Sequence, residues 1–159
     1  MKFTPMIHNG STYEQMKQVI VASPFEGDSV LSPSAQLVAS RLAGPNGTSH
    51  GYVIRRVTAT PSGNSYNIGI GQKLATICTP GAKANFSFDE RFIVTHFYRG
   101  NRADLLLIDL QSGQELEITN MPAGAYAQFP HFRSDGWIYF LVIDGNDQYI
   151  AASDAAVRL

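Results

Sequence analysis

The chain has 159 residues, of which 44 % are hydrophobic and 16 % charged, and its formal net charge is −1. Such a chain can bury a sizeable core, which excludes a disordered protein. The near-zero charge without a basic run argues against nucleic acid as a partner, because phosphate binding needs a positive surface. No apolar stretch approaches the roughly 20 residues of a membrane-spanning helix.

Cysteine and glycine usage narrow the fold further. Cys78 is the single cysteine, so neither an intrachain disulfide framework nor a zinc site of several thiolates is expected. The 14 glycines and 8 prolines, with few charges, are typical of short strands joined by tight turns. We expect no cofactor and no metal. The N-terminus shows no signal peptide, which leaves a cytoplasmic protein or a processed periplasmic fragment as alternatives.

The first predicted element is a strand over residues 12–21, directly after the turn Asn9-Gly10-Ser11. A repeat follows it. The segments 31–39, 86–94 and 132–140 align without gaps, each with a large apolar residue, a turn-prone stretch and an apolar strand. In the turns we assign structural roles to Asp89, Asp135 and Gly136, because Asp caps turn amides and Gly accepts a positive φ.

A second set of strands follows each of these hairpins, at residues 51–54, 105–110 and 148–152. After the first two come the turns 62–64 and 112–114, and then a more polar strand, clearest at 115–119. Four antiparallel strands with apolar inner members and a polar outer one are typical of a β-propeller blade. We therefore predict an all-β fold in a single domain, with blade pieces at 24–80, 81–125 and 126–159 and an outer strand within 1–23.

The last two units also resemble a known family. The sequence PHFRSDGWIYF at 130–140 resembles the Pro-x-Trp-Ser-Pro-Asp-Gly-x-x-Ile-x-Phe signature of TolB-like β-propeller repeats, which form WD-repeat-like blades. The segment 107–113 resembles the strand of these repeats that ends in Asp-x-x-x-Gly. The likeness spans residues 24–159 and is degenerate in the first unit, where Ser34-Ala35 replaces Asp-Gly. It implies the fold and leaves the activity open.

The ends of the chain predict an association. An outer strand at 12–21 without its blade, and a last blade without an outer strand, give about three blades per chain. Because rings have about four to eight blades, three cannot close alone. We expect two copies to form a six-bladed ring as a homodimer, each N-terminal strand completing the other copy's last blade. The alternative is a piece of a longer propeller.

No motif for a nucleophile, a phosphate loop or a helical zinc site is present. We expect a non-enzymatic binding or scaffold module that recognises a protein, peptide or glycan through its loops and central channel. The alternative is a hydrolase or lyase with residues at the channel mouth. The loop 43–50 is one candidate for recognition. The candidate ligand-binding residues are His131, His96, Arg99, Arg102 and Asn85, although a structural role for the two histidines is the alternative.

Overall fold

The computed structural model describes residues 1–21, 26–43 and 49–159. Every regular element in these ranges is a β-strand, which confirms the predicted all-β fold. None of the described residues belongs to a helix that could cross a membrane. Most of the predicted recognition loop at 43–50 lies outside the described residues.

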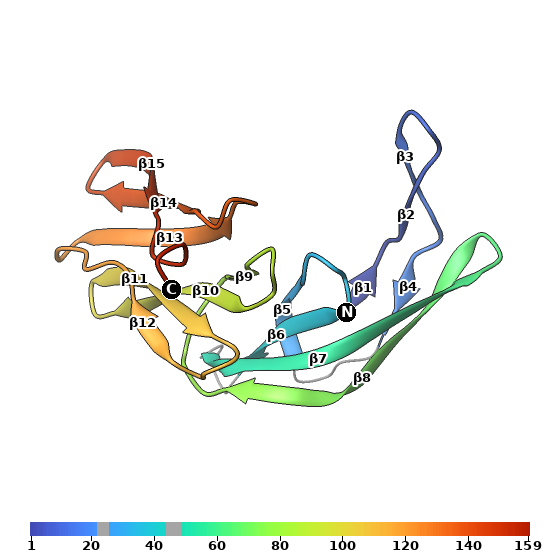
Figure 1. Ribbon diagram of the computed structural model, residues 1–159. Helices are drawn as coiled ribbons and strands as arrows, with labels where there is room; N and C mark the ends of the chain where they lie inside the picture. Colours follow the sequence, from blue (N-terminus) through green and yellow to red (C-terminus); the bar gives the residue numbers. More distant parts are fainter. Residues whose placement is uncertain (22–25, 44–48) are drawn as a thin grey trace.

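The first blade is a four-stranded antiparallel sheet in the order β5-β6-β7-β8. Its strands are β5 (Glu26–Leu31), β6 (Leu37–Ala43), β7 (Ser49–Ser62) and β8 (Ser65–Ile77). The last two are the longest strands of the described chain, and their hairpin reaches well beyond the rest of the sheet (Figure 1).

The second blade has four strands and the third has three. The second contains β9 (Ala84–Phe86), β10 (Phe92–Arg99), β11 (Arg102–Asp109) and β12 (Glu115–Glu117). The third contains β13 (Ala125–Phe132), β14 (Ile138–Asp144) and β15 (Asp147–Ser153). A parallel bridge between Ala103 and Tyr126 joins β11 to β13, so the two blades are hydrogen-bonded to each other. Within the described residues, β15 pairs with β14 alone and its outer edge is open.

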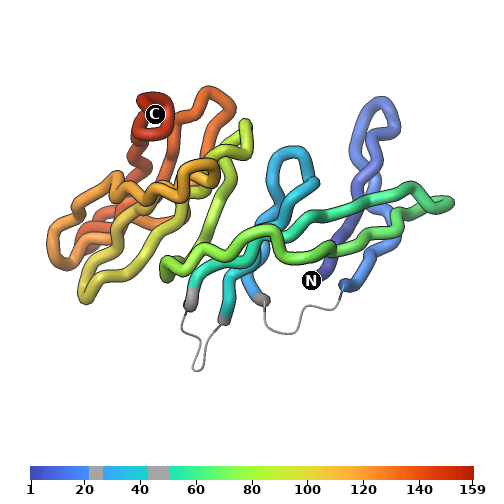
Figure 2. Tube along the Cα trace, turned by 60° about the horizontal axis from the view of Figure 1, so that its bottom comes forward, coloured from blue at the N-terminus to red at the C-terminus, as the bar shows by residue number. Residues whose placement is uncertain are grey.

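The N-terminal segment differs from the prediction. Residues 12–21 form two short strands, β3 (Tyr13–Gln15) and β4 (Val19–Ile20), instead of one unaccompanied outer strand. They pair with β2 (Met6–His8) and β1 (Lys2–Phe3), which precede them in the same chain. The prediction that residues 12–21 form an outer strand without its own blade partner is therefore wrong, because this segment already pairs within the same chain. The hairpin projects from the body of the molecule beside the first blade (Figures 1 and 2).

Two apolar clusters hold neighbouring blades together. One lies between the first and second blades and contains Ala39, Tyr52, Ile54, Ile77, Phe86, Ile93, Leu106 and Ile108. The other lies between the second and third and contains Phe92, Val94, Leu105, Leu107, Ala127, Phe132, Ile138, Phe140 and Val142. Strands β10 and β11 contribute one face to the first cluster and the opposite face to the second. This explains why they are apolar throughout, as expected of a sheet covered on both sides.

The turns that link the first two strands of each blade share one backbone conformation. Ala35, Glu90 and Gly136 occupy the same turn position with φ of 57°, 60° and 87°. Each donates its N–H to the carbonyl three residues earlier, at 2.9–3.0 Å. The gapless alignment is nevertheless displaced after this point. Phe86 pairs with Ile93, seven residues on, whereas Phe132 pairs with Ile138, six residues on, so the third turn is one residue shorter.

A buried hydroxyl pair joins the first two blades. The Tyr52 hydroxyl lies 2.6 Å from Thr95 Oγ1 and donates to the Ala82 carbonyl at 3.2 Å. Gly81 lies against this pair, and a Cβ there would come within 2.3 Å of the Tyr52 hydroxyl. Burial raises the pKa of Tyr52 to about 12, so the phenol stays protonated. The contact sets the approach of the two blades and leaves no room for a larger residue at position 81.

Candidate functional site

The first strands of the three blades lie side by side along one edge, where a propeller has its channel. Asn85 in β9 accepts a hydrogen bond from the Phe132 N–H of β13 at 2.9 Å. Lys83, just before β9, forms an ion pair of 2.9 Å with Asp28 in β5. These contacts place β5, β9 and β13 next to one another, so their side chains form a common surface.

Corresponding positions on these strands carry different side chains. Asp28, Lys83 and Phe129 each lie three residues before the large apolar residue that ends the first strand. Asp28 and Phe129 have positive φ values of 37° and 52°, next to register shifts in β5 and β13. Such bulges redirect side chains and are common beside functional sites. We call Asp28, Lys83, Tyr98, Gln128 and Phe129 the channel-edge surface.

The charged end of the channel-edge surface is an ion network. The Asp28 carboxylate contacts both Lys83 and Arg41, each at 2.9 Å. The Lys83 ammonium, with a smaller contribution from Arg41, lowers the pKa of Asp28 against the opposing effect of its partial burial. All three side chains reach solvent, so the network adds little to stability. It presents fixed charges of both signs to a ligand.

The aromatic end surrounds the buried His96. The imidazole Nδ1 accepts the Phe129 N–H at 3.4 Å, and the rings of Tyr98 and Phe129 lie 5.7 and 5.4 Å from it, edge to face. Burial, assisted by the nearby Lys83 charge, lowers the pKa of His96 to about 4. The ring is therefore neutral at pH 7 and supports the bulge at Phe129. Gln128 donates to the Tyr98 hydroxyl at 2.7 Å.

A groove of about 700 Å³ opens beside Tyr98, between the first and second blades. Its lining contains Arg41, Phe97 and Arg99, together with the carboxylates of Glu115 and Glu117. Arg99 pairs with Glu117 at 2.5 Å, and its guanidinium lies 5.2 Å from the Phe97 ring centre. The predicted ligand residue Arg99 therefore lines this groove with its charge already paired.

Arg102 lies in a different setting. Its Nε is 3.0 Å from the carboxylate of the fully buried Asp104, and it also donates to the Met121 carbonyl. The other oxygen of Asp104 accepts from Thr119 Oγ1 and from the Met121 N–H. Arg102 thus holds the connection between β12 and β13 and does not join the channel-edge surface.

The two remaining predicted ligand residues occupy matching positions in successive blades. Asn85 directly precedes Phe86, and His131 directly precedes Phe132. The Asn85 side-chain oxygen already accepts a hydrogen bond from the Phe132 N–H of the next blade. His131 is exposed on the last blade and no hydrogen bond fixes it among the described residues. Of the predicted set, His96 contacts Tyr98 and Phe129 of the channel-edge surface, and Arg99 lines the groove beside Tyr98.

The assigned turn residues cap their turns. Asp89 accepts from Ser87 Oγ at 2.5 Å and from the Arg91 N–H at 3.1 Å, and the Ser87 bond lowers the pKa of the Asp89 carboxyl. Asp135 accepts from the Trp137 N–H at 3.2 Å, and Gly136 has the positive φ of its turn. These contacts keep the Asp side chains at the turns, away from the channel-edge surface.

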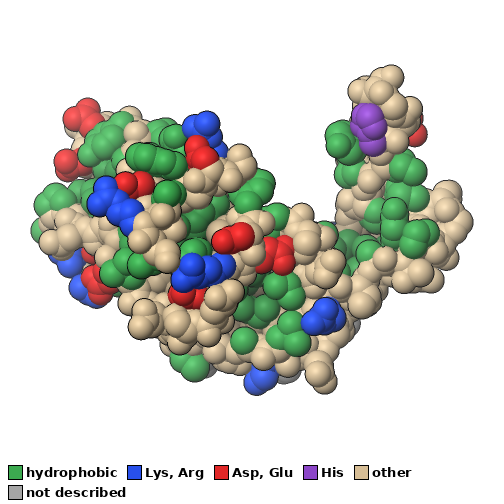
Figure 3. Space-filling view, in the orientation of Figure 1, with side chains coloured by type: hydrophobic (Ala, Val, Ile, Leu, Met, Phe, Trp, Pro, Cys, Tyr) green, Lys and Arg blue, Asp and Glu red, His purple; other side chains and the backbone are tan. Residues whose placement is uncertain are grey.

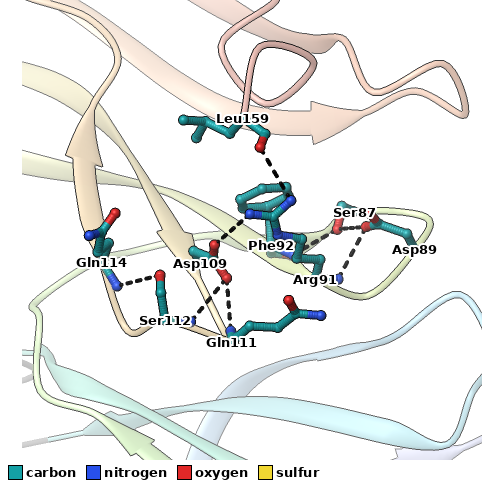
Figure 4. Close-up of polar contacts among 9 residues, drawn as sticks. All are labelled: Ser87, Asp89, Arg91, Phe92, Asp109, Gln111, Ser112, Gln114 and Leu159. Atoms are coloured by element: carbon teal, nitrogen blue, oxygen red, sulfur yellow. Dashed lines mark hydrogen bonds and ion pairs between the residues drawn. The ribbon is translucent and has the colours of Figure 1, made fainter.

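The turn of the second blade also anchors the C-terminal segment (Figure 4). Arg91 pairs with Asp109 at 2.9 Å and donates to the Leu159 carbonyl at 3.5 Å. Asp109 also accepts from the N–H groups of Gln111 and Ser112. Arg91, followed by these backbone bonds, lowers the pKa of Asp109 to about 2. The cluster therefore orders the turn before β12 and has no free acid or base.

No three or more His, Cys, Asp or Glu side chains of the described ranges gather closely enough to hold a metal ion. The sequence alone did not point to Asp28, Lys83, Tyr98, Gln128 and Phe129. Three of them could have been found from the repeat, because they share the position three residues before Leu31, Phe86 and Phe132. They have no residue type in common, so no motif marks them.

Comparison with known proteins identifies the fold. No family model and no curated protein sequence matches the chain. A solved structure assigned as TolB from Agrobacterium tumefaciens superimposes with a TM-score of 0.60 at 18 % identity, over 89 % of this chain and 46 % of its own. The fold is that of a TolB-type β-propeller. TolB from Acinetobacter baumannii gives a TM-score of 0.53 at 15 % identity, over 92 % of this chain and 33 % of its own.

These likenesses confirm the TolB-like part of the predicted resemblance, whereas a relation to WD repeats stays a prediction. At such low identity they show the fold alone. The chain spans less than half the length of either structure. Among the described residues the blades form an open array and not a closed ring.

Proposed function

We propose that this TolB-type array is a non-enzymatic binding module that recognises an extended peptide segment of another protein at the channel-edge surface. The observation that carries the proposal is that the fixed charges of Asp28 and Lys83 lie on one surface with the exposed rings of Tyr98, on β10, and Phe129, on β13. A peptide can bury apolar side chains on the rings and place its charged groups on the ion network.

The adjoining groove supports the same function. Its volume of about 700 Å³ matches several side chains, and it carries cations and carboxylates around an apolar floor. A peptide crossing from the aromatic end toward Arg99 would meet both charge signs within one site. A glycan could also stack on the rings, so it is a distinct outcome of the test below.

Three of the predicted ligand residues do not favour the alternative of a hydrolase or lyase. His96 is buried and neutral at pH 7, and it is occupied by the Phe129 N–H. Arg99 and Arg102 are paired with Glu117 and Asp104. General acid–base catalysis needs a group that can exchange protons with a substrate within hydrogen-bond reach.

Assembly is a second part of the proposal. The described blades leave an open edge at β15, and open edges and apolar faces favour association. We propose that a second copy of the chain completes the array. The corrected pairing of residues 12–21 means that this cannot occur by addition of a lone outer strand.

Selection from a phage-displayed random peptide library tests the binding site. We expect enriched peptides to bind the purified chain, and we expect Phe129→Ala to weaken that binding at least tenfold. The matched control is Phe88→Ala, which removes another exposed phenylalanine (56 % exposed, against 44 % for Phe129) from the turn next to Asp89. Equal loss in both variants, or binding that ignores Phe129, would reject the site. Binding of a glycan array in place of peptides would reject the peptide class.

A further inference from the structure

Each blade has one face directed at the next blade in chain order, which we call its downstream face. In the first blade this face carries Ala39, Tyr52 and Ile54, and all three are buried against the second blade. In the second blade the corresponding residues are Val94, Leu105 and Leu107, which are buried against the third. The correspondence follows from register, because Tyr52 pairs with Arg41 as Leu105 pairs with His96.

The third blade repeats this face without a neighbour among the described residues. Its register places Tyr139, Ile150 and Ala152 in the same positions, with Ile150 opposite Leu141. Ile150 is 67 % exposed, whereas its counterparts Tyr52 and Leu105 are both 0 % exposed. Trp137, directly before the β14 strand, is 39 % exposed. Apolar side chains therefore lie at the surface over this end of the molecule (Figure 3).

His131 occupies the position in the third blade that Asn85 occupies in the second. Asn85, its counterpart, bridges to the next blade by accepting the Phe132 N–H. A histidine ring nitrogen can accept a backbone N–H in the same way. The exposed His131 is thus placed to bond the first strand of whatever blade follows.

The opposite end of the array offers the complementary surface. Leu31 corresponds to Phe86 and Phe132, which are 2 % and 8 % exposed under the preceding blade, yet Leu31 is 42 % exposed. A groove of about 530 Å³ opens there, lined by residues 1–3, 27–31 and Val38. Because the Ser32 N–H bonds the Leu37 carbonyl, ladder alternation directs the Leu31 N–H away from β6.

From these two surfaces we infer that the downstream face of the third blade docks on the first blade of a second copy, with Trp137, Tyr139 and Ile150 packed near Leu31 and His131 bonded to the Leu31 N–H. The inference rests on the proposed self-assembly and names its interface. Such head-to-tail contacts close into a ring when the rotation allows. This chain covers 46 % of the Agrobacterium TolB structure, so two copies would together be about as large as the part of a propeller that one such structure forms.

The N-terminal hairpin limits how the copies meet. It contacts the first blade through Met1 Sδ, 3.9 Å from Ser40 Oγ, and through the Lys17 carbonyl, which accepts from Ser65 Oγ. Residues 1–3 also line the groove at Leu31, so the hairpin has to shift for a second copy to dock there.

Light scattering after size-exclusion chromatography tests the interface. We expect the wild-type chain to be a dimer at 50 μM (about an order of magnitude above a low-micromolar Kd). Ile150→Lys is expected to raise the dissociation constant at least tenfold, since it places a charge in an apolar contact. Leu116→Lys is the matched control, because Leu116 on β12 is 45 % exposed and lies on neither end surface. Both wild-type residues are largely exposed, so neither variant empties the core.

The outcomes separate the two proposals. A dimer that survives Ile150→Lys overturns the interface while leaving self-assembly intact, and a wild-type monomer overturns both. Neither result bears on the peptide selection at Phe129. A crosslink gives a second readout: in a Cys78→Ser background, the double substitution Leu31→Cys and His131→Cys should allow an intermolecular disulfide. Failure to form it in a dimer would contradict the placement of His131.

Discussion

The bond from Asn85 to the Phe132 N–H allows a direct measurement of how strongly two blades are joined at the channel edge. Asn85→Ala removes the acceptor and leaves a largely buried backbone N–H without a partner. An unsatisfied buried donor costs about 1–3 kcal/mol. We therefore expect the free energy of unfolding to fall by about 2 kcal/mol. For a chain of this size that corresponds to a fall in Tm of about 4–8 °C.

Urea unfolding followed by far-UV circular dichroism and by the fluorescence of the single tryptophan measures this loss. Asn85→Asp keeps an oxygen at the same position and is expected to recover most of the stability. Asn67→Ala, at an exposed site in β8, controls for the loss of an amide alone. A change below about 0.5 kcal/mol in Asn85→Ala, comparable to an ordinary surface substitution, would refute the reasoning.

Three further predictions concern the packing between blades and its pH dependence. Gly81→Ala should destabilise the chain by about 1–3 kcal/mol in thermal melts, because its Cβ would overlap the Tyr52 hydroxyl. Arg102→Ala should cost about 3 kcal/mol in urea unfolding, since it leaves the buried Asp104 carboxylate without its cation. The pKa of His96 is about 6.5 in the unfolded chain and is lowered to about 4 in the folded protein, so between these pH values only the unfolded chain binds the proton. Stability should therefore fall by about 3 kcal/mol as the pH drops from 7 to 4, and His96→Gln should remove that part of the slope.

The blade pattern could be predicted because it depends on local chemistry. Asp89 and Asp135 accept turn amides, and Gly136 takes a positive φ, as their residue types favour. Strands apolar on both faces indicated sheets covered on both sides. The ungapped alignment was wrong after Gly136, because a turn can lose one residue without changing which apolar residues pair.

The N-terminal pairing was missed for a physical reason. Residues 2–8 are interrupted by Pro5 and show no clear alternation, so they did not indicate a strand. Pairing with residues 12–21 arises through two short ladders on either side of that proline. The turn at Asn9-Gly10-Ser11 could have suggested a hairpin, since Asn-Gly commonly joins two adjacent strands.

The site was predictable only in part. Arg102 and Asp104 lie two residues apart on one strand and so share a face, which already favours an ion pair over a free ligand residue. His96 was identified as a channel candidate, but its burial depends on the bulge at Phe129, which no local pattern marks. The surface formed with Lys83 and Asp28 exists only once neighbouring blades are stacked.

The left-handed residue in each blade turn has a consequence for which sequences can encode this array. Ala35 and Glu90 adopt a conformation that glycine would adopt without strain, and Glu90 also accepts the Ser34 N–H of the neighbouring turn at 2.8 Å. Glycine at position 35 would relieve local strain, and the Ala35 side chain that it removes is exposed. At position 90 the same change would sever a link between adjacent blades. The same substitution at two sites with similar φ therefore has opposite effects, so a consensus drawn across the repeats would mislead at one of them.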